Sequence, residues 1–572
     1  VVKDGTSLAV STDIDGRFAI KASEGDVLKF SYVGMESKTV KVGKENELNV
    51  KLSSSLTELD EVVVVGYGTQ KKVNLTGAVS QVGEKALESR PVQNVSQALQ
   101  GLVPGMTFGV DAKGGQLNNT PSVSIRGAGT IGKGSTGSPL ILIDGVEGNM
   151  NLLNPLDIES ISVLKDASAS SIYGSRAPFG VILITTKQGK TGKPVVSYNT
   201  NIRFNSPLTD YDMMDSYRFM HYYNDARTNG GQAAYFSDEQ IANVLAYQRG
   251  EVGKIIPVTT SNTYTHNWAN ANTDWYDVFF KDHAMSQEHS LSLSGGTERF
   301  SYYLSGNFMD QEGLLNYADE SYYRYSVNGK INAKINKNIS LSYNTKWFRT
   351  NYEAPSYLNQ LFFHQIMRKW PNAFVTDPQG YWADNSEIIP LKEGGRMKED
   401  LDQNFQQLQL DVTPLPGWNI HLQGNMRITT NFTHTDRQAV YAHDANGEPY
   451  AIAITNATQP GQSRVIEKGT KNEFYTVNLF SDYSRQLGDH YFKVMGGFNA
   501  EHQNVRTLSA QRDGIIVPDL PTIDTSTEQD VAGGGYNHWA TAGFFGRLNY
   551  NYKEKYLLEV NGRYDGSSKF PK

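Results

Sequence analysis

The 572-residue sequence contains no cysteine. This absence excludes a disulfide framework, a thiolate metal site and a cysteine nucleophile. The sequence also lacks a run of about 18 apolar residues, so it predicts no membrane-spanning helix. Its first residues, VVKDGTSLAV, show no methionine, basic start or apolar core of a signal peptide. We therefore expect the natural start to be missing or processed.

Aliphatic residues and positive charge are also scarce. The hydrophobic share is 38%, the mean hydropathy is -0.47 and the net charge is -7. Nucleic-acid binding needs a basic face, and no lysine and arginine cluster interleaved with aromatics is present, so we expect no nucleic-acid partner. The abundant residues are glycine (53), tyrosine (32) and phenylalanine (24). This composition suits a β-sheet with one apolar and one wet face.

One glycine-rich stretch, SIRGAGTIGKG, resembles nucleotide-binding motifs. Gly127, Gly129 and Gly132 satisfy G-x-G-x-x-G, and the same stretch satisfies the first seven positions of a Walker loop. However, Gly134 stands where that loop needs serine or threonine, and an apolar strand follows instead of a helix. We interpret the stretch as a flexible loop. Because hydrolase motifs such as G-x-S-x-G and H-E-x-x-H are absent as well, we expect no enzyme activity, catalytic residue, cofactor or metal.

The first part of the chain divides into three segments. Residues 1–52 contain short strands (RFAI, VLKFSYV, SKTVKV and ELNVKL) separated by turn sequences, which predicts a small β-sandwich. Residues 53–72 form a linker that carries LDEVVVVGYG. Its valine run fits either one buried strand or a short exposed strand able to add to another protein's sheet edge. Residues 73–190 show the mixed pattern of a compact α+β domain, with a helix after Asn94.

Residues 191–572 alternate between apolar and polar side chains. The pattern is clearest in YSVNGKINAKIN and ISLSYNTKW, and it recurs to give about eleven strands near ten residues long. Short turns alternate with long polar connections at 207–284, 351–402 and 433–469. This asymmetry favours an outer-membrane β-barrel over a soluble β-sandwich or propeller. Eleven strands cannot close around a domain of about 115 residues, so we expect about half of the barrel to lie beyond Lys572.

The order of several motifs resembles one family. These motifs are LDEVVVVGYGTQKK, LTGAVSQV, SIRGAGTI, PLILIDGV, LNPLDIESISVLKDASASSIYGSRAPFGVILITTKQGK and YNTNIRFN. In this order they resemble the SusC-like TonB-dependent transporters of Bacteroidetes. The resemblance implies a mainly β fold: a carboxypeptidase-regulatory-like β-sandwich over 1–52, an α+β plug domain, and the first half of a large antiparallel transmembrane β-barrel. It also implies an outer-membrane location, with the plug and N-terminal domain on the periplasmic side.

The resemblance assigns two groups of site residues. The TonB box falls on Asp60, Glu61, Val62, Val63 and Val64. The plug motifs fall on Arg126, Gly127, Gly129, Asp144, Gly145, Tyr173, Gly174 and Arg176. We expect these plug residues to keep the plug folded and seated in the barrel. The usual Ala-Asn-Gly after the last motif reads Pro178, Phe179 and Gly180 here, which puts the local loop geometry in doubt.

The implied activity is energy-coupled import of a nutrient. Its partners would be TonB with ExbB and ExbD, a SusD-like surface lipoprotein and the lipid of the outer membrane. Oligosaccharides are the first expectation for cargo, oligopeptides the second, and a siderophore or cobalamin the third. A passive porin is the alternative of a different class. The residues that contact substrate cannot be identified, because specificity lies in long loops whose shape the sequence does not reveal.

Overall fold

The computed structural model describes most of the chain. The described residues are 1–3, 9–13, 16–31, 37–45, 47–52, 62–64, 67–71, 77–90, 92–109, 115–127, 129–130, 137–166, 170–208, 212–453 and 459–570. The chain forms two compact units, Val1–Leu75 and Thr76–Lys572. Each unit is described by itself below.

The first unit contains a three-stranded sheet and a separate strand pair. The sheet has the antiparallel order β1-β2-β3, and β4 pairs with β5. The strands are β1 (Val2–Lys3), β2 (Val27–Phe30), β3 (Lys38–Lys41), β4 (Val62–Val64) and β5 (Thr69–Lys71).

Two of the four strands expected in this unit are not formed. Residues 17–20 and 47–52 have no ladder partner in the structure, whereas the other two expected segments form β2 and β3. In the RFAI segment, the side chain of Phe18 packs against another residue, although the backbone pairs with no neighbouring strand. Its ring meets that of Phe30 edge-on, with centroids 5.3 Å apart. Apolar character alone therefore misled the strand prediction there.

The expected plug domain lies at the start of the second unit. Its five-stranded sheet has the order β10-β9-β12-β11-β6, in which only β9 and β12 are parallel, and β7 pairs with β8 separately. The strands are β6 (Val79–Gly83), β7 (Met106–Gly109), β8 (Ser122–Ile125), β9 (Leu140–Ile143), β10 (Val146–Glu147), β11 (Ile158–Leu164) and β12 (Val181–Thr186). The helices are α1 (Glu84–Glu88), α2 (Val95–Leu99), η2 (Met150–Leu152), η3 (Pro155–Asp157) and η4 (Ser171–Arg176).

The helix expected after Asn94 is confirmed as α2. The Asn94 side chain accepts a hydrogen bond from the backbone N–H of Gln97, 2.9 Å away, which satisfies a donor that the first helical turn leaves free. Helix α2 then buries Val95 and Leu99 in the plug core, together with Ile161 of β11.

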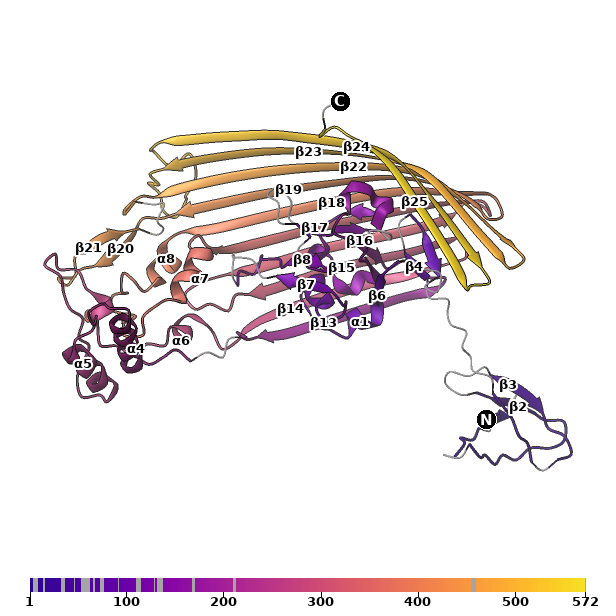
Figure 1. The fold of residues 1–572 in the computed structure, drawn as a ribbon, viewed down its shortest axis with the longest axis horizontal. Coiled ribbons are helices and arrows are strands. Elements are labelled where there is room, and N and C mark those ends of the chain that lie inside the picture. Colours follow the sequence, from indigo (N-terminus) through magenta and orange to yellow (C-terminus); the bar gives the residue numbers. More distant parts are fainter. Residues whose placement is uncertain are drawn as a thin grey trace. The chain divides into compact units, whose positions relative to one another are not determined.

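Eleven strands form one antiparallel sheet, which we call the wall. Each strand of the wall pairs with the wall strand before it and the wall strand after it along the chain (Figure 1). The expectation of about eleven barrel strands is therefore confirmed. The wall consists of β13 (Gly192–Asn205), β14 (Ala284–Gly296), β15 (Phe300–Glu312), β16 (Ser321–Lys334), β17 (Ile339–Pro355), β18 (Arg396–Leu415), β19 (Trp418–Arg437), β22 (Arg464–Leu487), β23 (His490–Asp513), β24 (Asp530–Tyr552) and β25 (Tyr556–Ser567).

The long connections carry structure of their own. The first contains α4 (Ser216–Asn229), α5 (Asp238–Gln248), η5 (His266–Trp268) and α6 (Trp275–Phe279); the later ones contain α7 (Gln360–Ile366), α8 (Ile388–Glu393), β20 (Val440–His443) and β21 (Pro449–Ile452). These segments share an apolar core in which Trp275, Phe362 and Val440 come from three different connections. Across the described part of the chain, no helix combines the length and apolar character needed to cross a membrane.

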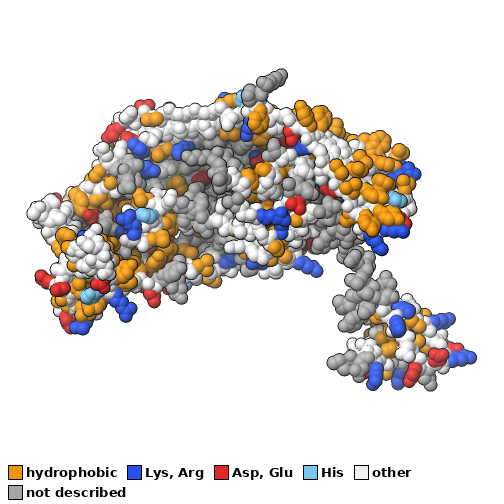
Figure 2. Space-filling view, in the orientation of Figure 1, with side chains coloured by type: hydrophobic (Ala, Val, Ile, Leu, Met, Phe, Trp, Pro, Cys, Tyr) orange, Lys and Arg blue, Asp and Glu red, His pale blue; other side chains and the backbone are white. Residues whose placement is uncertain are grey.

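Most wall strands are longer than the ten residues expected from the sequence. Strands β22 and β23 have 24 residues each. Only the half of β23 nearest the short turns is apolar on its outer face, from Phe492 to His502, and about ten tilted residues suffice to cross the hydrocarbon layer. Figure 2 shows hydrophobic side chains gathered over this end of the wall. In the expected barrel the strands would thus continue beyond the membrane, where the outer face mixes polar residues with single apolar ones such as Leu508.

This division predicts a depth-dependent cost for charge on the outer face. Leu479→Arg, in the apolar half of β22, should destabilise the full-length parent protein in lipid vesicles by about 2–4 kcal/mol. Leu508→Arg, on the outer face of β23 beyond the apolar half, should cost about 0–1 kcal/mol. Both leucines are exposed, at 47% and 68%. Equilibrium unfolding in urea would measure the difference, and equal costs would contradict the proposed membrane position.

Candidate functional site

The first part of the site is a tight turn at the tip of the β9–β10 hairpin. Asp144 and Gly145 join Ile143 to Val146, which pair across the turn. Their φ angles are 47° and 86°. A two-residue turn with two positive φ values is of type I′, and this geometry favours Asp-Gly. The DG motif therefore fixes the backbone so that a carboxylate stands at the end of the hairpin.

The Asp144 carboxylate is buried between the plug and the wall. Its Oδ2 atom lies 2.6 Å from Nζ of Lys346 on β17, and its Oδ1 atom lies 3.4 Å from Nζ of Lys330 on β16. Asn344 donates a hydrogen bond to Oδ2 at 2.9 Å, and the Thr186 hydroxyl on β12 donates at 2.6 Å. One plug carboxylate is thus held by one plug strand and by two neighbouring wall strands.

The two lysines decide the charge of Asp144. Burial by itself would raise the pKa of this carboxyl, but the charges of Lys330 and Lys346 outweigh burial and hold the pKa well below its ordinary value of 3.8. A carboxyl with a depressed folded pKa contributes stability above its unfolded pKa, and this contribution is lost only as the pH falls through the folded value. The ion cluster is therefore intact at neutral and mildly acidic pH. Asp157, by contrast, contacts the hydroxyl of Tyr303 at 2.7 Å, and there burial prevails and raises the pKa.

A second charged cluster surrounds Arg176 at the end of η4. Its guanidinium forms ion pairs with Glu147 of the plug and with Glu501 of wall strand β23. Arg427 of β19 donates to the backbone carbonyl of Glu147. The Arg176 guanidinium also lies 5.9 Å from the centre of the Phe474 ring, so the wall provides both an opposite charge and an aromatic face.

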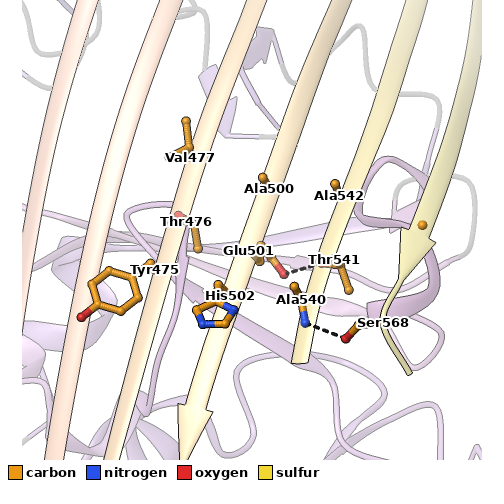
Figure 3. Close-up of a pocket in the computed structure, with 11 residues that line it drawn as sticks. Tyr475, Thr476, Val477, Ala500, Glu501, His502, Ala540, Thr541, Ala542 and Ser568 are labelled. Atoms are coloured by element: carbon orange, nitrogen blue, oxygen red, sulfur yellow. Dashed lines mark hydrogen bonds between the residues drawn. The ribbon is translucent and has the colours of Figure 1, made fainter. Parts of the chain in front are cut away.

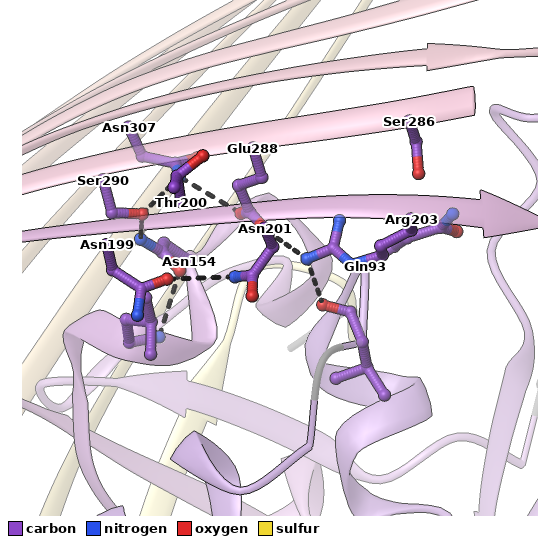
Figure 4. A network of polar contacts seen from close by, with 12 residues as sticks. Gln93, Asn154, Asn199, Thr200, Asn201, Arg203, Ser286, Glu288, Ser290 and Asn307 are labelled. Atoms are coloured by element: carbon purple, nitrogen blue, oxygen red, sulfur yellow. Dashed lines mark hydrogen bonds and ion pairs between the residues drawn. The ribbon is translucent and has the colours of Figure 1, made fainter.

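A third cluster joins the plug to the first wall strands. Arg324 of β16, almost fully buried, donates to the backbone carbonyls of Gln93 and Asn151, each at 3.1 Å, and to Glu288 of β14 at 3.1 Å. Arg203 of β13 also pairs with Glu288 (Figure 4). The arginines thereby hold plug backbone groups that would otherwise lack partners, while Glu288 compensates their charge.

Two predicted glycines allow close approach. A Cβ atom on Gly174, whose φ is 66°, would overlap the Asp565 carboxylate of β25. A Cβ atom on Gly129 would overlap the Phe179 ring. Phe179 is one of the residues that departs from the family pattern, so its ring occupies the space that the absent Gly129 side chain leaves.

The remaining predicted residues have different surroundings. Arg126 and Gly127 follow β8 directly, with φ angles of 60° and 88°. The Arg126 side chain is exposed, and its backbone N–H donates to the carbonyl oxygen of Gly105. Tyr173 is buried. Of the predicted TonB box, Asp60 and Glu61 lie outside the described residues, and Val62–Val64 form β4.

The sequence analysis did not identify the wall residues of any of the three charged clusters. Lys330, Lys346, Glu288, Arg324 and Glu501 occupy inward positions of alternating strands, where they read as ordinary polar residues of a wet face. The available signal for these residues was a charged side chain at a strand position that faces inward. For Lys330, Lys346 and Glu501, the charged partner on the plug lies 186 to 325 residues away along the chain, so no local pattern could identify it.

Above the plug contacts, the inner face of the wall changes character. The ladder places Thr429, Asn472 and Asn537 one step beyond the row of Arg427 and Phe474. The next rows contain Asn431, Thr470, Thr507 and Ser509. Glu399 faces the same space, but its oxygens accept hydrogen bonds from Asn118 and Asn431. This surface offers mainly hydroxyl and amide groups, with Val505 in the row of Asn472 and the exposed Lys468 in the row of Ser509. Within the described residues, no group of His, Cys, Asp and Glu could hold a metal ion.

Comparison with known proteins agrees with this architecture. Residues 71–181 match the TonB-dependent Receptor Plug Domain, and residues 1–64 match the CarboxypepD_reg-like domain. The whole chain is 30% identical to TonB-dependent receptor P26 of Formosa agariphila and 28% identical to TonB-dependent receptor SusC of Bacteroides thetaiotaomicron, covering 54% and 55% of those proteins. The chain spans about half the length of these curated relatives.

A solved structure shows the same fold. The RagAB peptide importer in its open-open state superposes on this chain with a TM-score of 0.70 and 23% identity. The match covers 89% of this chain and 57% of the RagAB chain.

The Asp144 cluster predicts a large effect of a small substitution. Asp144→Asn in the full-length parent should weaken plug docking by about 3–5 kcal/mol, because two lysines are left without their buried carboxylate. Hydrogen exchange of the plug amides would measure the opening free energy. Glu88→Gln is the matched control: its pair with Lys187 is partly exposed, and its loss should cost about 0–1 kcal/mol. Similar effects of the two substitutions would refute the assigned importance of Asp144.

Proposed function

Because this chain belongs to the SusC-like TonB-dependent receptor family, whose members are outer-membrane proteins, we propose that it is part of an energy-coupled importer. Solute binds on the extracellular side, and TonB pulls on the periplasmic side until part of the plug moves. The observation that carries this proposal is the charged docking of the plug on the wall, through Asp144, Arg176 and Arg324.

The charged docking explains why import needs work. Removing a buried carboxylate from its lysines leaves uncompensated charges, which costs about 3–5 kcal/mol for one broken pair. Three such clusters make spontaneous opening rare. A passive porin has no use for this arrangement. The outer membrane has no ATP, so the work comes from the inner membrane through TonB with ExbB and ExbD.

The segment Asp60–Val64 is the proposed point of attachment. Its last three residues form β4, whose Val62, Val63 and Val64 pair with Lys71, Gln70 and Thr69 of β5. A strand in a two-stranded pair has one further edge, with backbone groups able to bind an added strand. TonB therefore pairs either on that edge or in place of β5.

We propose an oligosaccharide as the cargo. The inner face beyond the plug contacts presents hydroxyl and amide groups such as those of Thr470, Asn472 and Thr507, which match neutral, hydroxyl-rich molecules. Oligopeptides are the second candidate, because backbone amides suit the same groups and the RagAB structure is that of a peptide importer. The scarcity of positive charge on this face makes an anionic siderophore a weaker candidate, and cobalamin remains with it as the third candidate. A SusD-like lipoprotein completes the proposed complex on the cell surface.

Attachment through β4 predicts a backbone-specific effect on import. Val63→Pro in the full-length protein removes one backbone N–H and should abolish energised uptake while solute binding remains. Val63→Leu keeps that N–H and should import at the wild-type rate. Uptake of labelled solute by cells, with equilibrium binding as the second readout, separates the two. Normal flux in Val63→Pro would favour a porin.

The cargo proposal predicts what remains bound after gentle purification. The full-length parent, taken from its native outer membrane, should retain a SusD-like lipoprotein and a glycan, both identified by mass spectrometry. A mixture of peptides in the same preparation would replace the oligosaccharide by the second candidate. An iron chelate without a lipoprotein would overturn both.

A further inference from the structure

A groove runs along the outer face of β22, β23 and β24, with a volume of about 540 Å³. Antiparallel partners share a face, and the ladder places Tyr475, His502 and Ala540 in one row and Val477, Ala500 and Ala542 in the next. Figure 3 shows these side chains across three neighbouring strands. The small side chains of the alanines form the floor, and Tyr475 and Val477 form one side.

A second groove adjoins the first, and the side chains of Tyr475 and Val477 separate the two. The second groove has a volume of about 310 Å³ and is lined by Leu408, Gly424 and Met426 together with Tyr475 and Val477. Both grooves lie at the upper edge of the apolar half of the wall, and both have almost entirely apolar linings. Two parallel, apolar furrows on a membrane-facing surface have the shape that extended hydrocarbon chains fill.

Basic side chains stand above the grooves at the level expected for lipid head groups. Trp347 of β17 marks the membrane interface, and Arg349 follows it on the same face, 5.7 Å from the Trp347 ring. The ladder places Lys471 and Arg506 in the row of Arg349, directly opposite each other on β22 and β23. Lys471 is four residues beyond Tyr475, roughly 13 Å along the strand.

The direct pairing of Lys471 and Arg506 points to an anion. Like charges opposite each other on neighbouring strands are destabilising unless a counter-charge lies between them. The acidic groups nearby are Glu473, 2.7 Å from Lys471, and Asp402, which is already bound by both donor positions of Arg349. Arg506 is exposed, and His538 lies on the same face between it and the groove, which His502 lines. One carboxylate thus faces two cations.

We propose that this surface is a specific site for a phosphate-bearing, acylated lipid of the outer leaflet. Its acyl chains lie in the two grooves beside Tyr475, and its phosphate binds Lys471 and Arg506. The site requires only that the wall sits in the outer membrane, so it is independent of the cargo and of TonB coupling. A bound lipid of this kind would also hold the wall at a fixed depth, because one end of the ligand is apolar and the other is charged.

Native mass spectrometry of the full-length parent in detergent tests the site. The probes are bisphosphorylated lipid A, its dephosphorylated form and phosphatidylethanolamine. We expect one tightly bound bisphosphorylated molecule, with binding about tenfold or more weaker for the dephosphorylated form and for the variant Lys471→Gln/Arg506→Gln. Ala500→Leu, which fills the groove from the surface without touching the basic pair, should weaken the bisphosphorylated and dephosphorylated lipids alike.

The matched control is Arg485→Gln/Lys553→Gln, which removes two positive charges near the short-turn end of the wall. It should bind lipid A as the wild type does. Equal loss in both double variants would show a general charge effect and overturn the site. Equal binding of phosphatidylethanolamine and lipid A would reduce it to ordinary membrane contact. Solute uptake, measured in parallel, keeps this result separate from the proposed transport function.

Discussion

The structure depends on a buried carboxylate that belongs to one part of the protein and is neutralised by another. Asp144 stands at the tip of a plug hairpin, and Lys330 and Lys346 come from adjacent wall strands. None of these three charges would be tolerated in its buried position without the others, because an isolated buried ion is far less stable than one in water. Plug and wall therefore each carry an uncompensated charge at this point when apart, and docking of the plug neutralises both.

The other contacts repeat this logic along the interface. Arg176 pairs with Glu501, and Arg324 binds plug carbonyl groups while Glu288 balances its charge. Charged contacts differ from an apolar interface in one useful way. They hold the plug firmly while formed, yet their separated groups are well hydrated once water enters. Such an interface is stable against thermal opening but reversible under a directed pull, which is what the proposed energy-coupled import would require.

The wall combines two environments on single strands. In β23 the apolar outer residues end near His502, and Arg506 and other polar residues follow. A long antiparallel ladder is rigid, so the part in the membrane fixes the position of the part beyond it. This continuity fixes the basic pair Lys471 and Arg506, and the inner rows of hydroxyl and amide groups, at set distances from the apolar half.

The sequence alone determined the architecture, because alternation, turn residues and motif order are local properties. It predicted about eleven wall strands and the helix that Asn94 caps. It placed the strand ends wrongly, since the ladder continues where the outer residues are mostly polar and the alternation is weak. Only the tertiary structure decided what Asp144, Arg176 and Gly174 meet on the wall, because their wall partners lie more than 180 residues away along the chain. Ion pairing depends on the distance between two charges in space. Alternation along a strand shows only which face of the sheet a residue is on, so it does not identify the partner.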